Sequence, residues 1–109
     1  MRLDLSVLQP GAYAVLRERA TYGLLKKVQA NIDSESDTVK DPAQFADDML
    51  QGLVVEWNVT DEDGMLVPLP KLATSEQIDN IAAEIIGKVL EAARKVLSAG
   101  TPDPKTGTP

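Results

Sequence analysis

Residues 74–98 read TSEQIDNIAAEIIGKVLEAARKVLS, and this stretch carries the strongest periodic pattern in the chain. Thr74 followed by Gln77 forms a capping box of the T-x-x-Q type, which is typical of a helix start. Beyond it, apolar side chains recur at alternating spacings of four and three, as on one face of an amphipathic helix: Ile78, Ala82, Ile85, Val89, Ala92 and Val96. Further apolar residues, Ile81, Ile86, Leu90, Ala93 and Leu97, widen this stripe. The pattern predicts one long helix over residues 75–98.

Two shorter helices are predicted upstream of this stretch. One covers residues 21–31, and the other starts at Asp41-Pro42, where Asp suits the N-cap and Pro the first helical position. The second helix either ends near Gly52 or runs on to about Trp57. Residues 53–59, LVVEWNV, are rich in β-branched side chains, so a strand is an equal alternative there.

The N-terminal region is predicted to begin with a strand. Residues 3–7, LDLSV, alternate apolar and polar side chains, and the turn signal Gln9-Pro10-Gly11 follows. Residues 12–20 fit either the second strand of a hairpin or the start of a helix. The two prolines of Met65 to Pro70 predict an extended segment.

Together these patterns predict a mainly α fold, as a small α or α+β single domain. It would contain two or three helices, a long C-terminal amphipathic helix and, in one of the alternatives, a short N-terminal β-hairpin. Residues 1–98 form the predicted globular domain. Residues 99–109, with three prolines and two glycines, are predicted to be a flexible polar tail.

Composition narrows the classes of function. The 109 residues include no cysteine and no histidine, so thiol nucleophiles, imidazole bases and the usual zinc ligands are missing. Nothing in the sequence places two carboxylates in an apolar pocket, as acid/base catalysis would require. We therefore expect no enzyme, no cofactor and no metal site.

Charge and hydropathy narrow the range of partners. The net charge of −6 is distributed as +3 over residues 1–31, −9 over residues 32–64 and zero over residues 65–109. An acidic centre argues against nucleic acid, because phosphate contacts need clustered Lys and Arg. No stretch approaches the roughly 20 apolar residues of a membrane span, and the start lacks the apolar core of a signal peptide. We expect a cytoplasmic protein that binds no membrane.

The candidate functional residues are apolar. Tryptophan is enriched at interface hot spots, and the near-heptad spacing of the C-terminal stripe suits self-association or a partner helix. The competing interpretation is that the same side chains fill the domain's own core. The predicted partner-binding residues are Trp57, Ile78, Ile81, Ile85, Val89 and Val96.

The segment from Met49 to Leu97 resembles small tail assembly chaperones of long-tailed (siphovirus-type) bacteriophages. The resemblance rests on LVVEW at 53–57, the turn at 61–64, PLP at 68–70 and a final helix followed by a polar tail. It implies a protein that binds the tape-measure protein, a long helix-rich polypeptide, and keeps it soluble during tail assembly in the host-cell cytoplasm. It also implies no cofactor and no catalysis.

Two other classes share these properties. One is a structural virion component, such as a head–tail connector or a minor capsid or tail protein. The other is a small regulatory protein that binds its target through the C-terminal helix. The sequence leaves these classes open.

Overall fold

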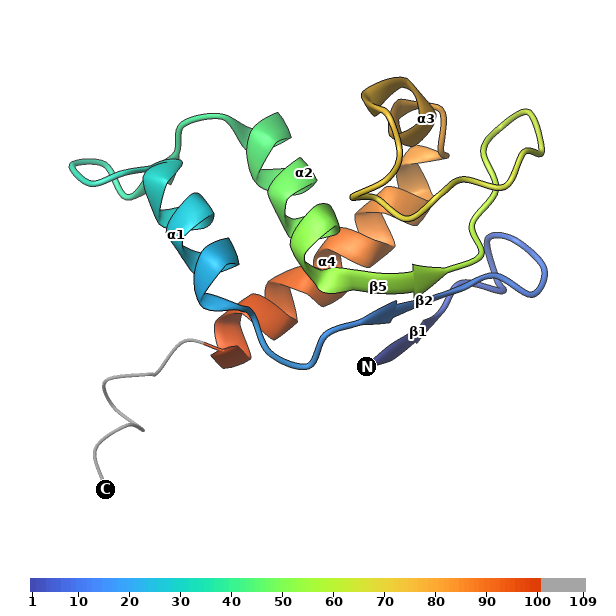
Figure 1. Cartoon of the computed structure of the whole chain (residues 1–109), viewed down its shortest axis with the longest axis horizontal. Coiled ribbons are helices and arrows are strands. Elements are labelled where there is room, and N and C mark those ends of the chain that lie inside the picture. Colours follow the sequence, from blue (N-terminus) through green and yellow to red (C-terminus); the bar gives the residue numbers. More distant parts are fainter. Residues whose placement is uncertain (101–109) are drawn as a thin grey trace.

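The computed structural model describes residues 1–100, with side chains through Ser98. The described chain forms four helices, a three-stranded sheet and a pair of two-residue strands (Figure 1). In chain order the elements are β1 (Arg2–Asp4), β2 (Tyr13–Leu16), α1 (Tyr22–Ala30), β3 (Ile32–Asp33), β4 (Thr38–Val39), α2 (Pro42–Leu53), β5 (Val54–Trp57), α3 (Ser75–Asp79) and α4 (Ala83–Gly100). Strands β1, β2 and β5 form one antiparallel sheet in that order, and β3 pairs with β4. α2 packs between α1 and α4, and α4 runs across one face of the sheet.

The prediction of a mainly α fold is wrong, because the chain is a single small domain of mixed α+β structure. Both stretches that the sequence left ambiguous contain strands, β2 within residues 12–20 and β5 within residues 53–59. These two strands pair with each other although α1 and α2 lie between them in the chain. Strand formation depends on such long-range partners, which no local pattern displays.

A bulge explains why residues 53–59 show no simple alternation. Ala14 lies opposite Trp57 and Leu16 opposite Val54, with a shift of register between Val15 and Leu16. Val54 and Trp57 are therefore both buried although they are three residues apart. In a regular strand, residues three apart point to opposite faces.

Two side-chain amides fasten the β1–β2 turn to the chain beyond β5. Asn58 accepts the Tyr13 N–H at 2.8 Å and donates to the Gly11 carbonyl at 2.9 Å. Gln9 donates to the Thr60 carbonyl at 2.8 Å and accepts the Thr60 N–H at 3.1 Å. These four hydrogen bonds hold the hairpin against β5. Side chains therefore support the sheet in addition to the backbone hydrogen bonds between its strands.

The two upstream helices are confirmed close to their predicted positions. Thr21 caps α1 by accepting the Leu24 N–H, and Asp41 caps α2 with a proline in the first turn. The helices approach closely at Gly52, where an added Cβ would lie 2.9 Å from Cδ1 of Leu24. The missing side chain at this position allows buried Leu24 to pack against the backbone of α2.

The prediction of one continuous helix over residues 75–98 is wrong. The capping box at Thr74 forms as expected, but α3 ends at Asp79 and α4 starts at Ala83. The break lies at Asn80, whose carbonyl accepts the Glu62 N–H at 3.0 Å and whose side chain donates to Asp63 at 2.8 Å. The turn after β5 thus takes the backbone acceptor that a continuing helix would use.

The predicted tail lies mostly outside the described residues. Ala99 and Gly100 belong to α4, and residues 101–109 are not described.

Candidate functional site

The residues predicted to bind a partner lie mostly in the hydrophobic core. Their exposed fractions are 7% for Trp57, 5% for Ile81, 1% for Ile85, 0% for Val89 and 3% for Val96, whereas Ile78 is only half-buried. The indole N–H of Trp57 donates to the carbonyls of Val67 and Pro68, so this side chain holds the extended segment after β5. Of the six residues, Ile78 and Ile81 border an open surface.

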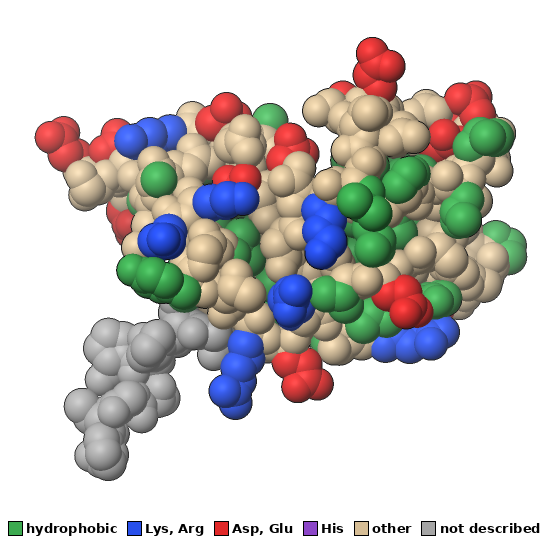
Figure 2. Space-filling view, in the orientation of Figure 1, with side chains coloured by type: hydrophobic (Ala, Val, Ile, Leu, Met, Phe, Trp, Pro, Cys, Tyr) green, Lys and Arg blue, Asp and Glu red, His purple; other side chains and the backbone are tan. Residues whose placement is uncertain are grey.

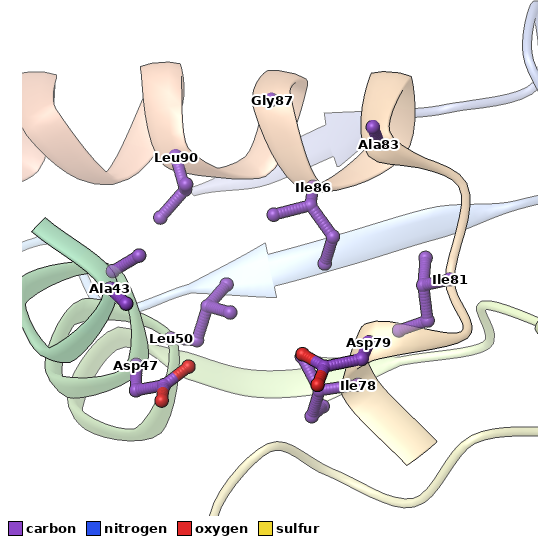
Figure 3. Close-up of a pocket in the computed structure, with 11 residues that line it drawn as sticks. Ala43, Asp47, Leu50, Ile78, Asp79, Ile81, Ala83, Ile86, Gly87 and Leu90 are labelled. Carbon is purple, nitrogen blue, oxygen red and sulfur yellow. The ribbon is translucent and has the colours of Figure 1, made fainter. Parts of the chain in front are cut away.

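That open surface is a groove between α2, α3 and α4, with a volume of about 420 Å³ (Figure 3). We name it the α2–α4 groove. Its lining is mainly aliphatic and consists of Ala43, Ala46, Asp47, Leu50, Ile78, Asp79, Ile81, Ala83, Ile86, Gly87 and Leu90. In Figure 3 the side chains of Leu50, Ile86 and Leu90 point into the space between the helices. The groove therefore offers an apolar floor that no element of the described chain covers.

Ile86 and Leu90 were not among the predicted site residues, although a signal for them existed. Both belong to the residues that widen the apolar stripe of the last helix beyond its central row. The central row packs into the core, and these flanking side chains remain half-buried. The apolar stripe of the last helix is broader than the core of this domain requires. This excess width was the sign of a binding surface in the sequence.

Gly87 contributes an unusual gap to the groove wall. It lies inside α4, where glycine is less favourable than alanine by about 1 kcal/mol. An added Cβ would meet no atom within 4 Å, so no packing within the chain requires a glycine. At Gly87 the backbone of α4 therefore faces the groove without a side chain to cover it.

Two carboxylates, Asp47 from α2 and Asp79 from α3, lie at the groove (Figure 3). Burial raises the pKa of Asp47, and the negative charges of Asp79, Asp48 and Asp41 raise that pKa further. Neither the Asp47 nor the Asp79 carboxylate accepts a hydrogen bond or joins an ion pair with another described residue. The groove thus combines apolar walls with uncompensated negative charge.

The surface around the groove is also acidic. On the face drawn in Figure 2, Asp and Glu side chains gather along the edge that carries α2, α3 and the loops beside them. Lys and Arg side chains lie over the middle and the lower part of this face, and a few lie among the acidic groups at its upper left. A cationic partner would therefore meet a favourable potential as it approached the groove.

The described residues contain no cluster of three or more side chains suited to hold a metal ion. In the same part of the chain, no helix has both the length and the apolar character to cross a membrane. The acidic turn has a structural use, since the Asp61 carboxylate accepts the N–H groups of Asp63 and Met65.

Comparisons with known proteins give no match. This holds for protein-family models, curated proteins and solved structures alike.

Proposed function

We propose that this protein is a non-enzymatic assembly chaperone that binds a helix-rich protein. More specifically, we propose a tail assembly chaperone of a siphovirus-type bacteriophage, which binds the tape-measure protein and keeps it soluble in the host-cell cytoplasm. The observation that carries the proposal is the α2–α4 groove, an uncovered aliphatic surface between three helices. The resemblance of residues 49–97 supplies the specific partner.

The walls of the groove favour a helix over an extended chain. They consist of α2, α3 and α4, whose backbone groups are largely bonded within each helix. An extended occupant would lose water from its N–H and C=O groups without finding a strand edge to pair with. A helix satisfies its own backbone and needs only apolar contact, which is how amphipathic helices bind grooves.

The size and charge of the protein suit a temporary complex. A groove of about 420 Å³ takes only part of one helix face, so each contact with a long client would be modest. The net charge of −6 would add solubility to a complex whose client exposes apolar helices. A modest contact also allows later displacement by the subunits that assemble on the client.

The test is an affinity purification of the full-length tagged protein from cells that produce it, read by mass spectrometry. The matched pair of variants is Gly87→Leu, which fills the groove, and Gly23→Leu, which adds the same side chain at an open position on α1. We expect the parent protein and Gly23→Leu to recover one very long, helix-rich phage protein, and Gly87→Leu to lose it. Co-expression with the parent protein should then raise the soluble fraction of this client.

Recovery of assembled head or tail proteins in place of the long client would refute the chaperone and identify a virion component. Equal recovery of the client by both leucine variants would show that the groove is not the binding surface.

A further inference from the structure

We infer that the occupant of the α2–α4 groove is an amphipathic helix that carries Lys or Arg along one edge of its apolar face, where these side chains meet Asp47 and Asp79. The inference deepens the proposed function and rests on it, since it names the chemistry of the helix that the groove takes. Two independent features of the groove carry it.

The first feature is the negative charge of Asp47 and Asp79, which no positive group of the described residues neutralises by an ion pair. Asp47 and Asp79 repel each other across the groove, and Asp41 and Asp48 add to the negative potential at Asp47. No cation of the described chain is among the groups that act on the Asp47 carboxylate. Lys88 and Lys95 of α4 line a separate hollow beside Met1, Arg2 and Leu3. A cation from outside the chain is therefore the missing partner, and a Lys or Arg on a bound helix would supply it.

The second feature is the small size of the wall residues. Ala43 of α2 and Ala83 and Gly87 of α4 lie along the groove, and space for a Cβ at Gly87 is left empty. Packed helices come within 8–10 Å of each other, and the distance depends on the side chains at the contact. Small wall residues allow the closer approach, which brings the long stems of Lys or Arg within reach of the rim.

The two features coincide at one place, and this coincidence points to a ligand. Gly87 weakens its helix and the carboxylate pair repels itself, yet neither improves a contact inside the chain. Residues that destabilise the free protein and improve no contact within it are expected at functional sites. A cationic helix in the groove would benefit from both features, since the glycine allows it to approach closely and the carboxylates attract its charge.

The experiment uses the full chain and three synthetic amphipathic peptides that share one Leu/Ala face. Their flanking positions carry Lys, Gln or Glu, so that only charge differs among them. Titrations followed by ¹⁵N-¹H NMR give the dissociation constants, and the backbone N–H of Gly87 reports directly from the groove wall. The protein variants are Asp47→Asn/Asp79→Asn, which removes both charges, and the Gly87→Leu and Gly23→Leu pair.

We expect the Lys peptide to bind the parent protein roughly 3- to 10-fold more tightly than the Gln peptide, as one or two partly screened ion pairs would give. The Glu peptide should bind most weakly. The advantage of the Lys peptide should vanish at high salt and in Asp47→Asn/Asp79→Asn. Gly87→Leu should abolish the shifts in the groove, and Gly23→Leu should preserve them.

The other outcomes separate this inference from the proposed function. Binding of all three peptides in the groove with equal affinity would overturn the cationic occupant and leave a helix-binding protein. Failure of every peptide to shift the groove would overturn both. Shifts at Gly87 that grow with protein concentration alone would identify a second copy of the chain as the occupant and overturn the inference.

Discussion

Replacing Gly87 by alanine is expected to stabilise the free protein, although Gly87 lies in its candidate binding site. Glycine inside a helix is about 1 kcal/mol less favourable than alanine. The new methyl group would touch nothing within 4 Å, so neither a clash nor a packing gain changes this figure. We expect the free energy of unfolding of Gly87→Ala to rise by about 0.5–1 kcal/mol. In a domain of this size the midpoint of thermal unfolding would rise by about 2–8 °C.

The assay is urea and thermal denaturation followed by far-UV circular dichroism. Gly23→Ala is the matched control, because its methyl group also enters open space but lies in the first turn of α1, and Gly23 does not line the groove. It should stabilise less than Gly87→Ala and leave peptide binding unchanged, whereas Gly87→Ala should weaken the binding of the Lys peptide. If Gly87→Ala lowered the stability, the fold itself would need this glycine, and the argument that it serves a partner would fail.

Three further changes have expected outcomes. Asp47→Asn should raise the thermal midpoint at pH 7 by about 1–4 °C, since it removes like-charge repulsion of a few tenths of a kcal/mol. Because the pKa of Asp47 is raised in the folded state, this penalty exists above that pKa and disappears as the pH falls through it, so the two proteins should converge in melts toward pH 4; a constant difference would contradict this. Trp57→Phe removes the donor to two carbonyls and should lower the free energy of unfolding by about 1–3 kcal/mol in urea titrations, with no change if those bonds are unimportant. Asn58→Ala should cost about 1–3 kcal/mol and speed hydrogen exchange at the Tyr13 N–H, while unchanged exchange would show that the hairpin holds without this amide.

Helix starts were predictable because their signals are local. Thr21, the Asp41-Pro42 pair and the Thr74 capping box each act within one helical turn, and the structure uses all three as caps. The hairpin and the strand at residues 53–59 were left as alternatives, and both are present. Local chemistry therefore located where α1, α2 and α3 begin, but not the start of α4 at Ala83.

The fold class and the end of α3 were not predictable in the same way, since long-range partners determine both. Val54 becomes part of a strand because Leu16 lies opposite it, and the helix stops at Asn80 because Glu62 binds its carbonyl. Periodicity over residues 75–98 continues across the break and gives no sign of it. A prediction from periodicity alone was bound to join α3 to α4.

The groove illustrates a similar limit for function. The period of the last helix identifies its apolar side, but the position of α2 decides which part of that side is covered. Ile85 and Val89 are consequently buried, while Ile86 and Leu90 line the groove. Sequence reasoning pointed to the helix that lines the groove, but it could not separate the core side of that helix from its open side.

The late position of α4 in the chain has a consequence for synthesis. This helix supplies five buried core side chains, Ile85, Val89, Ala92, Ala93 and Val96. Until it has left the ribosome, the core residues that precede it, which include Leu16 and Trp57, lack these five packing partners. At a synthesis rate of about 5–20 residues per second, the nascent chain spends seconds in this exposed state. A protein proposed to keep the helices of others soluble is therefore itself exposed during synthesis, and its groove forms only after α4 has been translated.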